Sequence, residues 1–145
     1  VAHRMGEFVF SHAGISSEWL DDTVTDWTEE NMVDKINELF KYTPLALDYR
    51  SYRMLNSTEV IGSGGYGNES YQGPMWIRPK ALMSVNKDTL RKKIIQVVGH
   101  TYQNEIDKQG KATGGRYYFV DVQETSQEYM IITDGQISFN NVPKK

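Results

Sequence analysis

Cysteine is absent from this sequence of 145 residues. Its absence excludes disulfide bonds, thiolate metal ligands and a cysteine nucleophile. The redox compartment stays open, because a chain without cysteine is compatible with reducing and with oxidising surroundings. Any metal site in this chain must therefore be built from imidazole and carboxylate ligands.

Long apolar runs and an excess of one charge are missing as well. No apolar run approaches the roughly 18 residues that a membrane span needs, and no basic-then-apolar leader opens the chain. The 16 Lys and Arg nearly balance the 19 Asp and Glu, which leaves no field for nonspecific binding to nucleic acid or membranes. We therefore expect a soluble, cytoplasmic protein with no nucleic-acid or membrane partner, whose oligomeric state the sequence leaves unknown.

The length favours one domain, since single domains typically run to about 100–200 residues. Residues 7–11 and 94–98 are apolar runs that stop at glycine turns, which predicts two buried strands. Residues 28–40 carry apolar side chains at helical spacing together with an acidic first turn, and so predict a helix. Shorter helices are expected at 79–84 and 88–93.

The last third of the chain is predicted to be β-structure, with strands at 116–122, 128–133 and 136–139. Asp134-Gly135 joins the last two strands, and this dipeptide suits a two-residue type I′ hairpin turn. Strands that first alternate with helices and then close as an antiparallel meander predict an α/β fold, in which helices cover a mixed sheet. The chain begins at Val1 rather than Met, which is expected of a piece of a longer protein.

Histidine is scarce: the chain has three, and His3 lies near a terminus that we expect to be frayed. His12 and His100 share a local setting, because each follows an apolar strand directly or through one glycine. Ligands bind at the carboxyl ends of strands in open α/β sheets. Convergent histidines there suit Zn, Fe, Ni or Mn, although two imidazoles cannot complete a metal site. A hydrogen-bonded structural role is the alternative for each histidine.

One arginine stands out because it lies on a stiff turn. Arg78 is flanked by Trp76 and Pro79. A guanidinium held in this way can bind a phosphate with two parallel hydrogen bonds. The alternative is an arginine that stacks over Trp76 with its head group in water.

A glycine-rich segment at residues 62–67 matches the pattern G-x-G-x-x-G. The dinucleotide fingerprint also requires a preceding strand and a helix that opens at the last glycine, and neither is predicted here. A flexible loop is therefore favoured over nucleotide binding.

Three motifs, in this order, resemble the C-terminal half of the calcineurin-like metallophosphoesterases. They are residues 8–15, which contain His12-Ala13-Gly14, residues 76–79 with Trp-Ile-Arg-Pro, and residues 97–101 with Val-Val-Gly-His-Thr. The chain is most similar to the serine/threonine protein phosphatase branch and to bacterial and phage enzymes like it. The resemblance covers nearly the whole chain except residues 21–72, where we expect an insert or a cap beside the site.

The resemblance implies a four-layer α/β/β/α sandwich with two divalent metal ions (Mn, Fe or Zn) at the carboxyl edges of its central strands. It assigns His12 and His100 to one of the two metals and Arg78 to the phosphate of a phosphorylated substrate. The implied reaction is hydrolysis of a phosphomonoester, such as a phosphoprotein, or of a dinucleoside polyphosphate, through attack of a metal-bridged hydroxide on phosphorus.

The family's N-terminal motifs have no match in this chain: Gly-Asp-x-His-Gly, Gly-Asp-x-x-Asp-Arg-Gly and Gly-Asn-His-Glu. In the family they supply the bridging aspartate, the remaining ligands and the general acid. We therefore expect the isolated chain to be inactive and the metal sites to be completed by residues outside it. The late Asp-Thr-Gly motif is also altered after Asp121, so no role is carried onto that residue. The alternative is a binding or interaction module that keeps the scaffold without catalysis.

Overall fold

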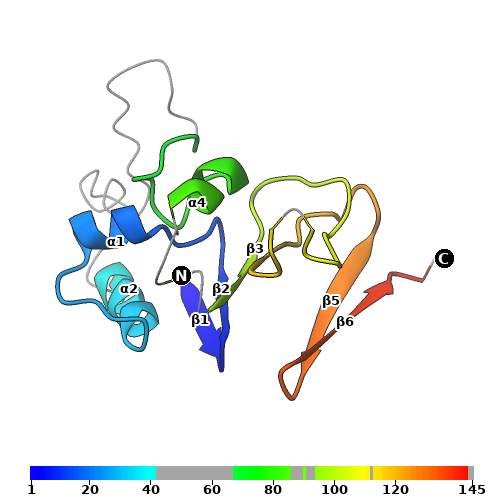
Figure 1. The fold of residues 1–145 in the computed structure, drawn as a ribbon, viewed down its shortest axis with the longest axis horizontal. Coiled ribbons are helices and arrows are strands. Elements are labelled where there is room, and N and C mark those ends of the chain that lie inside the picture. Colours follow the sequence, from blue (N-terminus) through cyan, green and yellow to red (C-terminus); the bar gives the residue numbers. More distant parts are fainter. Residues whose placement is uncertain (42–66, 86–89, 91–93, 112, 144–145) are drawn as a thin grey trace.

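The computed structural model describes residues 1–41, 67–85, 90, 94–111 and 113–143, which form a mixed α/β structure (Figure 1). Its elements in chain order are β1 (Ala2–Met5), β2 (Phe8–Ser11), α1 (Ser17–Thr23), α2 (Met32–Lys41), α4 (Pro79–Val85), β3 (Ile95–Val98), β4 (Tyr117–Phe119), β5 (Glu128–Thr133) and β6 (Gln136–Asn141). None of the described helices has the length and apolar character that a membrane crossing demands.

Four strands form one mixed sheet in the order β1-β2-β3-β4. Strand β1 runs antiparallel to β2, whereas β2, β3 and β4 run parallel. Ser11 pairs with Val98, and Val98 pairs with Phe119, so the three parallel strands end at the same edge. Every residue of β3 is buried, as expected of a central parallel strand. The predicted strands at 7–11 and 94–98 are thus confirmed, each beginning one residue later.

The two faces of this sheet pack against different partners, because successive side chains of a strand point to opposite sides. One face packs on the helices, through a cluster around Val9, Trp19 and Ile36 and a second around Leu82 and Val98. The other face carries Phe8, Ile95, Val97 and Tyr118, which pack with apolar residues of β5 and β6. The core therefore lies on both sides of the sheet, with α1, α2 and α4 on one side and the hairpin on the other.

The predicted helix at 28–40 begins later than expected, at Met32. Thr28 and Asn31 bind each other first: Thr28 N–H donates to Asn31 Oδ1 at 2.6 Å, and Asn31 N–H donates to Thr28 Oγ1 at 3.3 Å. These reciprocal bonds form a capping box with Thr28 at the N-cap, and Met32 N–H donates to Thr28 O at 2.9 Å, so residues 28–31 lead directly into the helix. The helix predicted at 79–84 is confirmed as α4. The one predicted at 88–93 lies outside the described residues except for Leu90.

Two elements were not predicted. The short helix α1 is capped by Ser16, whose hydroxyl accepts from Trp19 N–H, and it buries Trp19 and Leu20. Strand β1 forms where a frayed terminus was expected. Asn37 of α2 holds it, because Asn37 Oδ1 accepts from Ala2 N–H at 3.0 Å and Asn37 Nδ2 donates to Ala2 O at 2.8 Å.

The C-terminal hairpin is confirmed, but the mixed sheet does not end in an antiparallel meander. Strands β5 and β6 form a separate two-stranded sheet. The strand predicted at 116–122 is limited to β4, and the chain then turns where Val122 O accepts from Thr125 N–H and Gln127 N–H at 3.1 Å each. At the hairpin tip, Asp134 and Gly135 have φ of 51° and 78°, the positive values that a type I′ turn requires.

Of the predicted insert or cap at 21–72, the structure describes residues 21–41 and 67–72. Residues 21–41 include α2, whose Met32 and Ile36 are buried in the core beneath the sheet. The predicted glycine loop at 62–67 lies outside the described residues except for Gly67.

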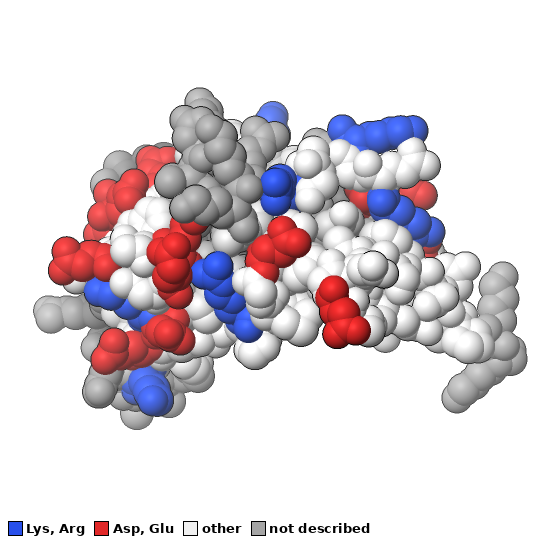
Figure 2. Space-filling model, turned by 60° about the horizontal axis from the view of Figure 1, so that its bottom comes forward, with Lys and Arg blue, Asp and Glu red and all other residues white. Residues whose placement is uncertain are grey.

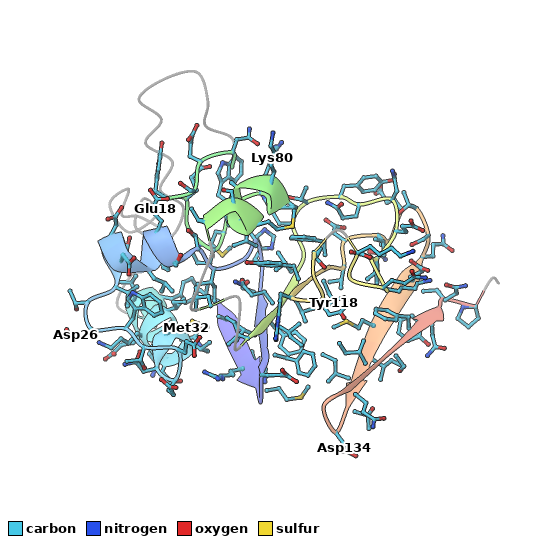
Figure 3. The ribbon with its side chains drawn as sticks, viewed as in Figure 1. Glu18, Asp26, Met32, Lys80, Tyr118 and Asp134 are labelled. Carbon is cyan, nitrogen blue, oxygen red and sulfur yellow. The ribbon has the colours of Figure 1, made fainter. Side chains whose placement is uncertain are left out.

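The hairpin docks on the sheet through apolar contacts and one carboxylate. Figure 3 shows Tyr118 between the sheet and the hairpin, where its ring lies 5.8 Å from that of Phe139. On the face drawn in Figure 2, charged side chains gather over the helical part and are few towards the hairpin end.

Glu128 of β5 forms an ion pair with Lys108 and also accepts from Ile106 N–H at 3.3 Å and Ser126 Oγ at 2.9 Å.

We predict that Glu128→Gln lowers the free energy of unfolding by about 1–2 kcal/mol at pH 7. This is the lower part of the range for loss of a charged hydrogen bond, because Lys108 is 43% exposed and water screens the pair. The hydrogen bond from Lys108, aided by those from Ser126 and Ile106, holds the pKa of Glu128 below its ordinary value. A lowered folded-state pKa gives stability that is complete above the unfolded-state pKa and is lost as the pH falls through the lowered one. Urea unfolding at pH 7 and at acid pH should therefore show a gap between wild type and variant that closes on acidification. The exposed Glu124→Gln is the control, and an equal loss there would contradict the prediction.

Candidate functional site

The parallel pairing of β2 and β3 brings two histidine-bearing loops to one edge of the sheet. His12 follows β2 directly, and His100 follows β3 through Gly99. Gly99 N–H donates to His12 O at 3.0 Å, so the backbones of the two loops remain hydrogen-bonded beyond the strands. The structure thus brings together the two histidines that the sequence singled out.

The imidazoles of these histidines are in direct contact. His12 Nε2 and His100 Nδ1 lie 2.8 Å apart, and the ring centroids are 4.6 Å apart at an interplanar angle of 63°. One nitrogen must donate and the other accept, so a neutral pair holds one proton between the two rings. His12 is exposed and His100 is partly buried, which leaves the pair open to solvent on one side.

His100 has an uncommon backbone conformation. Its φ is 64°, and Thr101 N–H donates to Gly99 O at 2.7 Å, which closes a three-residue turn around it. A positive φ in such a turn is strained for a residue with a side chain. Strain of this kind gathers at active and ligand-binding sites. The turn aims the His100 ring back at His12 instead of along the chain.

The surroundings of His100 favour its neutral form. Burial, then the positive charge of His12 and then that of Arg78 lower the pKa of His100, while Asp121 opposes them. A histidine whose pKa lies below its ordinary value is neutral at pH 7. Neutral imidazole is the form that binds a metal. Arg78 and Asp121 therefore both act electrostatically on His100.

A tight turn places Trp76 and Arg78 at this edge. Gly73 O accepts from Trp76 N–H at 3.0 Å, and Arg78 N–H donates to Gly67 O at 2.7 Å. The indole of Trp76 lies 5.5 Å from the His100 ring, centroid to centroid. Arg78 is exposed and precedes α4. The predicted phosphate-binding residue thus lies within electrostatic range of His100, one of the two predicted metal ligands.

A hollow of about 490 Å³ opens beside His12 on the hairpin face of the sheet. Its lining is mostly apolar and includes Phe10, Val97 and Val120, with His3 at its rim. The volume lies within the range of small-molecule pockets, which is about 300–1,000 Å³. A ligand bound at the histidine pair therefore has space on this side.

The separation of the two histidine nitrogens meets one requirement for a shared metal ion, which would have to displace the proton between them. Metal–imidazole bonds are about 2.0–2.1 Å long, so two nitrogens that share an ion must lie within roughly 4.2 Å of each other, and these two do. Within the described part of the chain, no group of three or more His, Cys, Asp or Glu could hold a metal ion. The remaining ligands would have to come from elsewhere.

Sequence reasoning missed one polar residue close to this site. Gln96 lies in β3 and is 1% exposed. Its side-chain amide accepts from Ile15 N–H at 2.8 Å and donates to Ile15 O at 2.9 Å. The available signal was an amide within the apolar run Ile-Ile-Gln-Val-Val, because a buried polar side chain needs partners.

Comparison of the chain with protein-family models, with curated proteins and with solved structures finds no match.

We predict that Gly67→Ala destabilises the Trp76–Arg78 turn. Gly67 has φ of 87°, and an added Cβ would lie 2.4 Å from Trp76 O and 2.6 Å from Arg78 Cγ. The free energy of unfolding should fall by about 1–3 kcal/mol, as overpacking costs. Urea unfolding tests this, with Gly114→Ala as the matched control, since its φ is also positive and its Cβ position is open. Equal losses in the two variants would count against the close contact at Gly67.

We predict that Zn²⁺ added at pH 7 changes the imidazole NMR signals of His12 and His100. Both rings are held towards one point, and the lowered pKa of His100 keeps that ring unprotonated. Because the chain has three histidines, His3 serves as an internal reference. His12→Ala should abolish the change at His100. A Zn²⁺ response at His3 equal to that of the pair would contradict the assignment.

Proposed function

We propose that this chain is part of a two-metal phosphoesterase that hydrolyses phosphomonoesters. In this proposal His12 and His100 bind one of two divalent ions (Mn, Fe or Zn), and Arg78 binds the phosphate of the substrate. The observation that supports it best is the 2.8 Å approach of His12 Nε2 to His100 Nδ1 at the carboxyl edge of parallel strands. Ligands bind at such edges in α/β proteins.

The proposal extends to the fold. A mixed sheet with helices on one face and a hairpin on the other is compatible with one half of a four-layer α/β/β/α sandwich. Residues outside this chain would complete the second sheet and the metal ligands. The resemblance of the three sequence motifs to calcineurin-like metallophosphoesterases is the ground for this extension.

The chain's own residues would contribute binding and charge. When bound, divalent metals supply water activation and neutralise charge on the phosphoryl group. His12 and His100 present imidazole nitrogens at one point, and the three-residue turn at His100 fixes this geometry before a ligand arrives. Arg78 donates from its guanidinium to phosphoryl oxygens, and because its charge is in place beforehand it stabilises the charge that develops there.

The alternative is a binding or interaction module on the same scaffold. It is favoured for the isolated chain because no third His, Cys, Asp or Glu joins the pair among the described residues. Hydrolysis of a dinucleoside polyphosphate is the other alternative, since the same arrangement of metals and arginine would act on a phosphoanhydride as well as on a phosphate ester.

We predict that the isolated chain shows no Mn²⁺-dependent hydrolysis of an aryl phosphate above background, whereas a longer parent that carries the missing motifs does. In that parent, His12→Ala and His100→Ala should lose metal and turnover. Arg78→Ala should lower kcat/KM about 10- to 100-fold, as loss of a charged hydrogen bond does. The exposed Lys80→Ala is the matched control for loss of a cation.

Steady-state kinetics with metal analysis test this proposal. Robust turnover by the chain alone would contradict the incomplete-site argument. Full turnover in both histidine variants of the parent, with partner binding retained, would favour the binding module instead.

A further inference from the structure

We infer that Gln96 is a positioning residue that sets the separation of His12 and His100. It touches neither ring. It acts through the backbone, because its buried side-chain amide binds both the N–H and the C=O of Ile15, at 2.8 and 2.9 Å. Ile15 lies three residues after His12, and Gln96 lies four residues before His100. Only the description of the histidine pair as a metal site rests on the proposed function.

The amide of Gln96 continues the strand pairing by other means. The chain leaves the sheet after Ser11 and turns at Gly14, whose φ is 109°. Ile15 is therefore not among the residues of β2 whose backbone pairs with β3. The amide supplies a donor and an acceptor in one plane, which matches one backbone N–H and one C=O. The segment from His12 to Ile15 is therefore bound to β3 at both ends, since Gly99 N–H also donates to His12 O at 3.0 Å.

This double attachment matters because the two rings are only 2.8 Å apart. Ligand geometry at a site must be held to within roughly 0.5 Å. Without the Gln96 contacts, the His12 loop would keep the bond from Gly99 N–H to His12 O and the bond from Ala13 N–H to Pro74 O, at 3.0 and 2.7 Å. Neither of these bonds joins Ile15 to β3, so the loop could shift relative to β3 by that amount.

A matched control lies elsewhere in the fold. Asn37 of α2 makes the same kind of contact, accepting from Ala2 N–H at 3.0 Å and donating to Ala2 O at 2.8 Å. Asn37 Oδ1 also accepts from the amino terminus of Val1 at 3.0 Å, and the contact holds the outer strand β1, whose Ala2 pairs with Ser11 of β2. It lies between β1 and α2 rather than between the His12 loop and β3. Asn37→Leu therefore removes an equivalent amide contact without loosening the attachment of His12 to β3.

The test compares Gln96→Met with Asn37→Leu in the whole chain at pH 7. The first readout needs no metal and no substrate: the scalar coupling between His12 Nε2 and His100 Nδ1 across their hydrogen bond, together with their ring shifts. We expect Gln96→Met to weaken the coupling and move both sets of shifts, whereas Asn37→Leu leaves them unchanged. The second readout is Zn²⁺ affinity, which should fall about 10-fold or more in Gln96→Met, as for other supporting residues.

Gln96→Glu is a second variant that keeps the acceptor for Ile15 N–H. Because burial favours the neutral carboxyl, which has an O–H donor for Ile15 O, we expect a smaller change in the same direction. Unchanged ring signals in folded Gln96→Met and Gln96→Glu would overturn the inference. So would an equal change in Asn37→Leu, because the effect would then reflect general loss of stability. If the Gln96 variants show the expected ring changes but the longer parent has no phosphatase activity, the proposed function is rejected and the role of Gln96 is retained.

Discussion

The parallel pairing of β2 with β3 is the interaction on which the other features depend. Ser11 opposite Val98 sets the register, and that register brings His12 and His100 together although 88 positions separate them in sequence. Parallel strands need a long crossover between them. The crossover here contains α1, α2 and α4 as well as the turn with Trp76 and Arg78. The β2–β3 pairing thus fixes the histidine contact. It also requires a long connection, and that connection places the indole of Trp76 and the guanidinium of Arg78 at the same edge.

Two side-chain amides, one buried and one partly buried, extend this sheet where backbone pairing stops. Gln96 attaches the segment after β2 to β3, and Asn37 attaches β1 to α2. Burial of an amide is costly unless its donor and acceptor are both used. Because each amide binds the N–H and the C=O of a single residue, its cost is offset and the position of that residue is specified. An apolar side chain in either place could fill the volume but could not fix the backbone.

Much of this fold was predictable where one strong local pattern decided the outcome. The apolar runs gave β2 and β3, and Asp134-Gly135 gave the hairpin turn, because their patterns have few alternatives. Strand β1 was missed because its polar His3 and Arg4 carry no apolar run, and its order comes from Asn37 on a distant helix. The separate hairpin could not be foreseen either, since nothing local distinguishes a strand that joins β4 from one that pairs with β6 alone. The pairing of His12 and His100 was expected from their settings, whereas Gln96 becomes visible once Ile15 is placed beside it.

The electrostatics of the site determine what must complete it. Burial, then the charges of His12 and Arg78, lower the pKa of His100, and Asp121 is the acidic group that opposes them there. The guanidinium of Arg78 gives this edge a positive charge before any ligand binds. A phosphate would be attracted to this edge by its positive charge. Two divalent cations beside a guanidinium, in contrast, would repel one another strongly. The imidazoles bring no negative charge to offset that repulsion. Under the proposed function, residues outside this chain would supply the remaining ligands, as the resemblance implies, and carboxylates among them would offset the charge of the ions. In that case His12 and His100 would contribute neutral imidazole ligands, and Arg78 would bind the phosphate.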